Sequence, residues 1–476
     1  MVKEDPVNRR IAVALACLLA IAAAWMACGP GGDGPPGPKN VILVTLDTLR
    51  PDHLGCYGHP TVQTPHLDAL AGRSVRFTQA VTVVPTTLAS HLSILTGTSP
   101  RTHGVPRNGF RAHEDNETLA EILKAHGYTT AAFVSAFSLD AQFNLTQGFD
   151  HYDCTYDEGL RWDMVRQAER RAEATTDAVL AWLGDRARAP FLLWVHYFDP
   201  HFPYDPPGRY VDLYDPDYRG TADGSMGYLE EVWEKRVFPS AEDRRHVIAL
   251  YDGEVSYLDE HVGRLLDALD ETRLAERSVV VVVADHGESL GEHEYDFDHG
   301  MYVYDASIRV PLLVRDPSVA GGRVVDEQVQ TLDLAPTILD LVGLPIPERM
   351  EGRSLAPLMR GRTPDAEPVV FSEASKPWNV EGESETVFRN EWKAKCARTD
   401  GWKFIYTPFA ERWELYDLAR DPGETLNLYG SEPARAEQMR RMLQAWATRP
   451  RSRLPTLDFT TDPETLERLR SLGYIQ

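Results

Sequence analysis

The stretch Ser278–Ala284 constrains the fold of this 476-residue chain more than any other. It contains five consecutive valines and no charge, and Asp285 and His286 follow it directly. An apolar run of this length, rich in β-branched residues, is typical of a strand buried on both faces of a parallel sheet. We therefore expect a central strand here, whose carboxyl end carries two side chains suited to metal binding.

Two further apolar runs end in the same way. Residues 40–46 lead into Asp47, and residues 191–198 lead into a loop that carries His201. Helical periodicity fills the intervals between such runs. Alternating strands and helices predict an α/β fold with a large, mostly parallel sheet sandwiched by helices. Because ligands bind such sheets at the carboxyl ends of the strands, we expect the polar groups at these three ends to converge.

Thr87 lies where another strand gives way to a helix. Pro85 precedes it, leucines follow at helical spacing, and Gly97 is suited to end the helix. Free N–H groups and the helix dipole favour an anion at such a start, and His91 lies on the same face. Alone, this pattern favours a helix-capping threonine. Together with the three strand ends, it favours a nucleophilic hydroxyl.

The candidate ligands Asp47, Asp285 and His286 suit a divalent metal ion. One nitrogen among mostly oxygen ligands allows Zn²⁺, Mn²⁺, Ca²⁺ and Mg²⁺, of which we favour Zn²⁺ or Mn²⁺. A metal beside Thr87 would lower the pKa of its hydroxyl. Histidines farther along the chain, such as His201, offer groups for substrate binding, leaving-group protonation or a second metal, or are ordinary loop residues.

The N-terminus predicts export. Arg9 and Arg10 precede an apolar run at 11–27, and Cys28 follows it. The segment 1–28 resembles a bacterial lipoprotein signal, in which Cys28 would carry the lipid, although Trp25 stands where Leu is usual. Plain cleavage and an uncleaved anchor are the alternatives. We expect a protein of the cell envelope or periplasm, anchored to the membrane or secreted, with residues 29–40 as a Gly/Pro-rich tether.

Charge and cysteine content exclude some classes of protein. The chain has 49 Lys and Arg against 72 Asp and Glu, a net charge of −23, which argues against nucleic-acid binding. Of five cysteines, two lie in the leader segment, so the remaining three allow one disulfide at most. None of them shows the Cys-x-x-Cys spacing, which argues against a zinc site made of cysteines alone.

The pattern changes after about residue 362. Short strands and then a helix at about 432–447 predict a small antiparallel α+β subdomain. We therefore expect a catalytic domain over residues 41–362 and a C-terminal subdomain with a tail over residues 363–476. The irregular segment 205–240, rich in Tyr, Asp, Pro and Gly, is interpreted as an insertion that covers the substrate site.

Ordered motifs carry a family resemblance over about residues 40–429. They are Asp-x-Leu-Arg-x-Asp-x-Leu-Gly-Cys-Tyr-Gly at 47–58, Ser-His-x-Ser-x-Leu-Thr-Gly at 90–97, Asp-Pro-His-x-Pro-Tyr at 199–204, Asp-His-Gly-Glu at 285–288 and Glu-Leu-Tyr-Asp-Leu at 414–418. In these motifs the chain resembles the sulfatase family of the alkaline phosphatase superfamily. The resemblance implies a metal-dependent hydrolase of ester bonds with the fold expected above.

The departures from the family pattern are equally informative. Thr87 stands where sulfatases that cleave sulfate monoesters carry a Cys matured to formylglycine. His91 replaces an Arg, Thr48 replaces a second metal-binding Asp, and His299 lies near the place of a missing Lys. Formylglycine chemistry is therefore not available to this chain.

The resemblance extends to branches of the superfamily with a Thr nucleophile. Phosphoethanolamine transferases are similar in the run at 285–292 and in the His-Gly pair at 299–300. There, an acid, the nucleophilic Thr and an Asp-His pair hold the metal, which implies Asp47, Thr87, Asp285 and His286 here. Phosphodiesterases place an Asn after the Thr to bind a phosphoryl oxygen, and Asn108 fits that role.

The leading hypothesis is a metal-dependent hydrolase or transferase of an anionic ester, a glycan, lipid or small molecule. Thr87 would be the nucleophile, Asn108 and His91 would bind substrate, and His201 or His299 would protonate the leaving group. A phosphoester or phosphodiester is preferred, because a sulfated Thr lacks the hydrate route by which formylglycine expels sulfate. Two alternatives are a sulfuric ester hydrolase without formylglycine and a non-catalytic lipoprotein that binds anionic glycans.

Overall fold

The computed structural model describes residues 39–156, 169–186, 190–363, 368–376, 392–399, 401–450, 454, 457–458 and 462–471. The predicted signal segment, Cys28 and nearly all of the tether lie outside these residues. Within the part described, no helix is long and apolar enough to cross a membrane.

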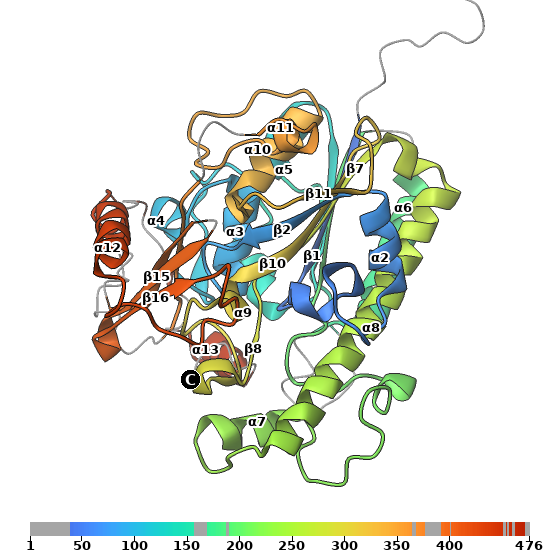
Figure 1. The fold of residues 1–476 in the computed structure, drawn as a ribbon. Coiled ribbons are helices and arrows are strands. Elements are labelled where there is room, and N and C mark those ends of the chain that lie inside the picture. Colours follow the sequence, from blue (N-terminus) through green and yellow to red (C-terminus); the bar gives the residue numbers. More distant parts are fainter. Residues whose placement is uncertain are drawn as a thin grey trace, which may run out of the picture. The chain divides into compact units, whose positions relative to one another are not determined.

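A nine-stranded sheet forms the centre of the described structure (Figure 1). Its order is β11-β2-β10-β7-β1-β6-β4-β5, with β12 beside β2. The five strands from β7 to β5 run parallel, whereas β10 is antiparallel to both of its neighbours. The expected large, mostly parallel sheet is confirmed. Its strands are β1 (Asn40–Leu46), β2 (Val75–Val81), β4 (Thr129–Phe133), β5 (His151–Asp153), β6 (Phe191–Tyr197), β7 (Ser278–Ala284), β10 (Arg309–Arg315), β11 (Arg323–Val325) and β12 (Val329–Gln330).

Helices cover both faces of this sheet, as Figure 1 shows. On one face lie α2 (Pro65–Gly72), α6 (Ala172–Arg186) and α8 (Ala241–Glu271), and on the other lie α3 (Thr87–Thr96), α5 (Leu119–Ala125) and α10 (Leu334–Leu341). Every residue of β1, β6 and β7 is buried as a result. This two-sided cover explains why their sequences are continuous apolar runs rather than alternating ones.

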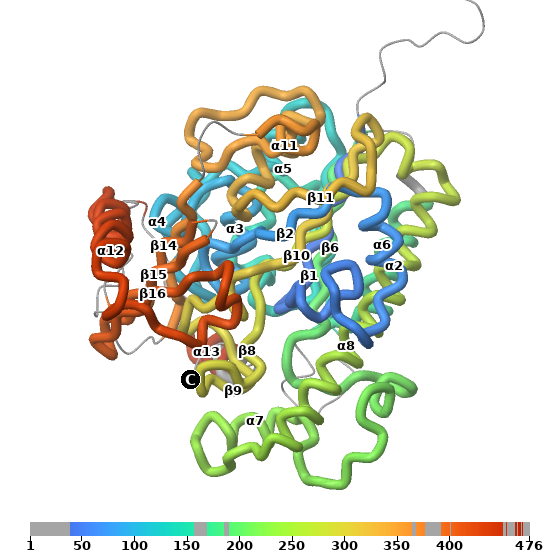
Figure 2. Tube along the Cα trace, viewed as in Figure 1, coloured from blue at the N-terminus to red at the C-terminus, as the bar shows by residue number. Residues whose placement is uncertain are grey.

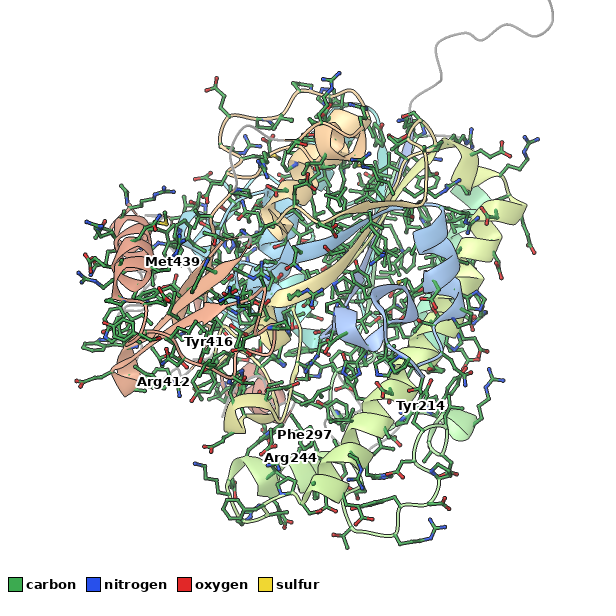
Figure 3. All side chains as sticks on the ribbon, viewed as in Figure 1. Tyr214, Arg244, Phe297, Arg412, Tyr416 and Met439 are labelled. Atoms are coloured by element: carbon green, nitrogen blue, oxygen red, sulfur yellow. The ribbon has the colours of Figure 1, made fainter. Side chains whose placement is uncertain are left out.

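The segment 205–240 is more ordered than its sequence predicts, because it contains α7 (Met226–Trp233), capped by the Ser225 hydroxyl. The hydroxyl groups of Tyr214 and Ser256, on α8, lie 2.6 Å apart. At the start of α8, Arg244 pairs with Asp296 at 2.7 Å, and Figure 3 shows Arg244 close to Phe297. The Trp233 indole N–H, at the end of α7, donates to the Asp296 carbonyl at 3.1 Å. The segment is therefore tied to α8 and to the loop that follows β7.

A second, four-stranded antiparallel sheet follows, as predicted, and Figure 2 shows it in orange to red with α12 against it. Neighbouring residues of its strands point to opposite faces. Ile405 joins the core shared with the main sheet, whereas Phe404 packs with Met439 and Trp446 of α12. The elements are β13 (Val370–Glu373), β14 (Lys395–Arg398), β15 (Trp402–Thr407), β16 (Arg412–Asp417) and α12 (Pro433–Ala447).

Short elements complete the described fold. They are β3 (Phe110–Arg111) with β17 (Leu457–Asp458), β8 (Ser289–Leu290) with β9 (Asp296–Asp298), and the helices α4 (Pro100–His103), α9 (Asp305–Ile308), α11 (Ala356–Met359) and α13 (Pro463–Ser471). Cys56, Cys154 and Cys396 are free thiols.

The packing of α12 can be tested by truncating Met439, which is 1% exposed. We expect Met439→Ala to lower the free energy of unfolding by about 2–5 kcal/mol, because it leaves a cavity between α12 and the sheet. Urea denaturation measures the loss. Gln444→Ala, at an exposed position of the same helix, should change the stability by less than about 0.5 kcal/mol. Equal effects of the two substitutions would contradict this packing.

Candidate active site

The carboxyl ends of β1 and β7 bring Asp47, Asp285 and His286 together. Leu46 pairs in register with Ala284, so the residues that follow them lie side by side. The Nε2 atom of His286 lies 3.7 Å from Asp47 Oδ1 and 3.5 Å from Asp285 Oδ2. One ligand atom from each side chain lies within 4.8 Å of the others, and all three side chains are fully buried. The predicted convergence at this sheet edge is present.

Four polar atoms of this cluster have no hydrogen-bond partner although they are buried. This applies to both carboxylate oxygens of Asp47, to Asp285 Oδ2 and to His286 Nε2. The Nδ1–H of His286 donates to the Gly287 carbonyl at 3.0 Å, so the ring lone pair is on Nε2. Two carboxylates and a correctly oriented imidazole form a donor set that fits a divalent cation.

Electrostatics support the same conclusion. Burial raises the pKa of Asp47 well above its ordinary value, and burial together with the Asp47 charge does the same for Asp285. Burial lowers the pKa of His286, so this ring is neutral. Two acids without a compensating cation are costly in a protein interior, and a bound cation removes that cost.

Thr87 is the first residue of α3, and its hydroxyl does not cap the helix. The capping position belongs to Thr86. The Oγ1 atom of Thr87 is buried and has no hydrogen-bond partner. The Ser90 hydroxyl, one turn on, donates to the Asp285 carbonyl at 2.7 Å and fixes the start of α3 against the cluster. The Thr87 hydroxyl is therefore not consumed by a structural bond.

His91 is engaged on both sides within the protein. Its Nδ1–H donates to the Thr87 carbonyl at 2.7 Å, and its Nε2 lies 2.9 Å from the Thr45 hydroxyl. The same Nδ1 is 3.6 Å from Asp285 Oδ2. This geometry favours a role in positioning Thr87 over the substrate contact expected from the sequence.

Asn108 lies at the start of α3, on the loop that follows α4. Its Oδ1 accepts the backbone N–H of Leu88 at 2.8 Å, which leaves the amide nitrogen as a donor. Asn108 is 3% exposed. A donor at a helix start adds to the N–H groups that favour an anion there.

A row of histidine rings extends from the cluster. The ring of His299 lies 4.4 Å from that of His286 and 5.2 Å from that of His201, between centroids. The Nδ1–H of His299 donates to Glu288 Oε1 at 3.0 Å, and that of His201 donates to the Phe202 carbonyl at 2.6 Å. The structure thus places His299 beside the candidate ligand His286, and His201 beside His299. Burial lowers the pKa of His201, and its N–H is already donated, so the geometry favours His299 of the two as the candidate proton donor.

Two residues of this region were missed by the sequence interpretation. His196, inside β6, accepts the Ser135 N–H on Nδ1, so its Nε2 proton faces Asp47 Oδ2 at 3.4 Å. Burial lowers the pKa of His196 to about 3, so this ring is a neutral donor. Lys376, beyond β13, pairs with Asp298 at 2.8 Å and brings a positive charge beside His299. His196 could have been noticed as a histidine within an apolar strand. Nothing in the sequence around Lys376 marks it as part of the site.

Thr48 replaces the second acid of the family pattern and has an unusual backbone. Its φ is +53°, a conformation that is rare for β-branched residues. Its N–H donates to Asp285 Oδ1 at 3.3 Å, and its carbonyl accepts from the Tyr251 hydroxyl at 3.0 Å. These bonds hold the strained turn directly after Asp47.

A second group, His53, His59 and Asp252, also has ligand atoms within 4.8 Å of one another. However, the Nδ1 of His59 accepts the backbone N–H groups of Thr61 and Val62. The proton of the neutral ring then lies on Nε2, so no ring lone pair remains for a metal. We interpret this group as a hydrogen-bonded cluster.

Comparison with known proteins decides the family. The sulfatase family model matches residues 39–344, and the model for the C-terminal region of N-sulphoglucosamine sulphohydrolase matches residues 291–449. The chain belongs to the sulfatase family. Among similar proteins, an ulvan-active sulfatase of Formosa agariphila is 31% identical over 70% of this chain and 67% of its own. An arylsulfatase of Clostridium perfringens is 27% identical over 85% of this chain and 93% of its own.

Solved structures agree with this assignment. A phosphonate monoester hydrolase from Silicibacter pomeroyi is 26% identical, with a TM-score of 0.67 over 86% of this chain and 94% of its own. A protein solved with its substrate D-glucosamine-2-N,6-O-disulfate has a TM-score of 0.71 at 20% identity, over 90% and 99% of the two chains. The chain is thus an ester hydrolase of the alkaline phosphatase superfamily, a class of metal-dependent enzymes.

The pH dependence of stability tests the buried acid pair. Because the pKa of Asp47 is raised above 3.8, the folded state holds a proton that the unfolded state releases, so Asp47 destabilises the metal-free protein as the pH rises above about 4. We expect Asp47→Asn to be more stable than the wild type in a chelator at about pH 8, by roughly 1 kcal/mol or more. The difference should shrink toward about pH 4, and urea denaturation measures it.

Asp217→Asn, at a side chain that is 99% exposed, is the matched control and should show no such pH dependence. Added Zn²⁺ or Mn²⁺ should stabilise the wild type by about 2.7 kcal/mol at a hundredfold excess over its Kd, but not Asp47→Asn to the same extent. A stability difference independent of pH and metal would contradict the proposed site.

Proposed function

We propose that this protein is a metal-dependent hydrolase or transferase of a phosphoester or phosphodiester, with Thr87 as the nucleophile. The observation that carries this proposal is the buried, unpartnered Thr87 hydroxyl at the start of a helix fixed to Asp285. A hydroxyl in such a position has no structural use, whereas it has a chemical one.

The residues of the site would divide the work as follows. A divalent cation held by Asp47, Thr87, Asp285 and His286 would lower the pKa of the Thr87 hydroxyl and neutralise charge on the ester. The Thr87 oxygen attacks phosphorus, and the N–H groups at the start of α3 bind a nonbridging oxygen together with Asn108.

The leaving alcohol takes a proton as the bond from phosphorus to its oxygen breaks. His299, whose Nδ1–H is held by Glu288, would supply this proton from a protonated Nε2. His201, whose ring lies 5.2 Å from that of His299, is the neighbouring candidate named by the sequence. Water then attacks phosphorus in the Thr87 ester and gives its proton back to His299, and the bond from phosphorus to the Thr87 oxygen breaks to release the product. An acceptor alcohol in place of water would make the enzyme a transferase. His91 holds the Thr87 carbonyl during both steps.

A phosphate-type substrate is preferred for a chemical reason. A formylglycine hydrate can expel sulfate from its own carbon, but a sulfated Thr87 must await attack by water at sulfur. The 26% identity to a phosphonate monoester hydrolase supports the preference. A sulfuric ester hydrolase that works without formylglycine is the second candidate, favoured by the names of the similar sulfatases.

We also propose that the enzyme works outside the cytoplasm, attached through Cys28 or released by cleavage. This proposal is supported by the order of Arg9 and Arg10, the apolar run at 11–27, Cys28 and the Gly/Pro-rich residues 29–38.

We also propose that residues 41–362 form the catalytic domain and that residues 363–476 form its C-terminal subdomain and tail. The separate sheet β13–β16 supports this division.

Removal of the nucleophile is the direct test. We expect Thr87→Ala to lower kcat on bis(p-nitrophenyl) phosphate by about a thousandfold or more, because no covalent intermediate can form. Thr87→Ser, which keeps a hydroxyl, should retain measurable turnover. Mass spectrometry of the quenched wild type should find a nitrophenylphosphoryl group on the peptide containing residue 87.

Two results would overturn this proposal. Unchanged activity of Thr87→Ala would exclude the covalent route. A sulfated Thr87 peptide, formed with p-nitrophenyl sulfate faster than the phosphoryl adduct forms, would establish the second candidate in its place.

The role of His299 as a proton donor can be tested by comparing substrates whose leaving groups differ in their need for a proton. A nitrophenolate leaves without a proton, whereas an alkoxide needs one. We therefore expect His299→Ala to reduce kcat/KM for an alkyl phosphodiester about a hundredfold more than for a nitrophenyl one. His126→Ala, which removes an exposed histidine, should reduce neither. Equal losses on both substrates would refute proton donation by His299.

A further inference from the structure

A cavity of about 460 Å³ is lined in part by His201. His201 is the last of three neighbouring rings, after His286 and His299. Glu169, Asp199 and Glu254 also line the cavity, and so do the aromatic rings of Phe198 and Tyr257. The His201 ring lies 5.2 Å from that of His299. The cavity therefore borders the active site.

One carboxylate of this cavity has an oxygen without a hydrogen-bond partner. Glu254 is 3% exposed, and its Oε1 accepts the Asp205 N–H at 3.0 Å, whereas no N–H of a described residue reaches its buried Oε2. The Glu254 side chain also interacts with the neighbouring carboxyl group of Asp199. Asp199, 6% exposed, accepts the N–H of Ala172 through Oδ2 at 2.9 Å. A buried carboxylate oxygen without a donor is costly unless a ligand provides the donor.

The cavity carries more negative than positive charge. Burial raises the pKa of Glu254, and the neighbouring Asp199 raises it further. Arg171 is the facing cation: it lies 3.6 Å from Glu254 and 3.1 Å from Asp205, and its side chain is 42% exposed at the rim. The other nearby arginine, Arg170, pairs with Asp153. A further cation would thus relieve repulsion among the acids.

The composition of the cavity favours an organic cation over a metal ion. Among the described residues, the groups whose ligand atoms gather closely enough for a metal lie elsewhere, at Asp47 and at His53. The cavity is also much larger than a single ion. Aromatic rings beside carboxylates are the surroundings in which ammonium groups bind, through ionic and cation–π attraction.

We propose that this cavity binds an ammonium group on the alcohol arm of the substrate, so that the leaving alcohol is a primary or quaternary aminoalcohol. The assignment to the leaving arm follows from His201, which lines the cavity and whose ring lies 5.2 Å from that of His299, the candidate donor of the leaving-group proton. This inference rests on the proposed function. It adds the substrate class, an ester that is anionic at phosphorus and cationic at the alcohol, which also suits a chain with a net charge of −23.

Direct binding tests the cavity without catalysis. Choline and its neutral isostere 3,3-dimethylbutanol are titrated separately into the whole protein, and binding is followed by calorimetry and ligand-detected NMR. We expect choline to bind at least about tenfold more tightly than the neutral alcohol. Glu254→Gln, which keeps an acceptor for the Asp205 N–H, should remove most of this preference. Asp267→Asn, at an exposed position of α8, should keep it.

The kinetic test compares phenyl choline phosphate with phenyl 3,3-dimethylbutyl phosphate, and the released alkyl alcohol is quantified. We expect kcat/KM for the release of choline to be at least about tenfold higher than for the release of 3,3-dimethylbutanol. In Glu254→Gln, the ratio of these two kcat/KM values should approach one. Glu254→Asp, which keeps the charge, should restore part of the ratio and serves as a check if Glu254→Gln folds poorly.

The outcomes separate the two proposals. Equal cleavage of both diesters without choline binding would overturn the ammonium site and leave the proposed function standing. Choline binding that is lost in Glu254→Gln, without cleavage of either diester, would support the cavity and overturn the phosphodiesterase function.

Discussion

The structure depends on the close approach of two buried carboxyl groups, those of Asp47 and Asp285, at the ends of adjacent parallel strands. In the part of the chain that is described, the ion-pair partners of both acids are histidines, and burial keeps these rings neutral. Like charges in a low-dielectric interior repel strongly. The surrounding elements are therefore arranged around a centre that only an added positive charge completes.

Main-chain and carboxylate acceptors set the orientation of the histidines at this centre. Four rings donate from Nδ1, to the carbonyls of Thr87, Phe202 and Gly287 and to Glu288; they are His91, His201, His286 and His299. In all four rings Nδ1 carries the proton that this bond uses, which fixes how the ring lies. Orientation through fixed acceptors makes the site preorganised, so little reorganisation is required when a substrate or cation arrives.

Much of this arrangement could be predicted from the sequence, because burial on both faces gives a parallel strand an unmistakable composition. The runs before Asp47 and Asp285 located the sheet and the edge where ligands bind. The antiparallel direction of β10 could not be read from its residues, since a strand covered on both faces has the same composition in either direction. His196 and Lys376 were missed because their roles depend on what lies opposite them in space. The acids of the further cavity come from three segments and share no local pattern.

At Thr48 the backbone is left-handed, although the Thr side chain does not favour that conformation. A φ of +53° is unfavourable for a β-branched residue, whereas Asp and Asn adopt it more readily. The main chain after Asp47 therefore has a form that suits an acid, although the side chain is not one. An exchange of Thr48 for Asp would require no new backbone conformation, so the number of acids at this centre can change in one step, in evolution or in the laboratory, while the scaffold remains the same.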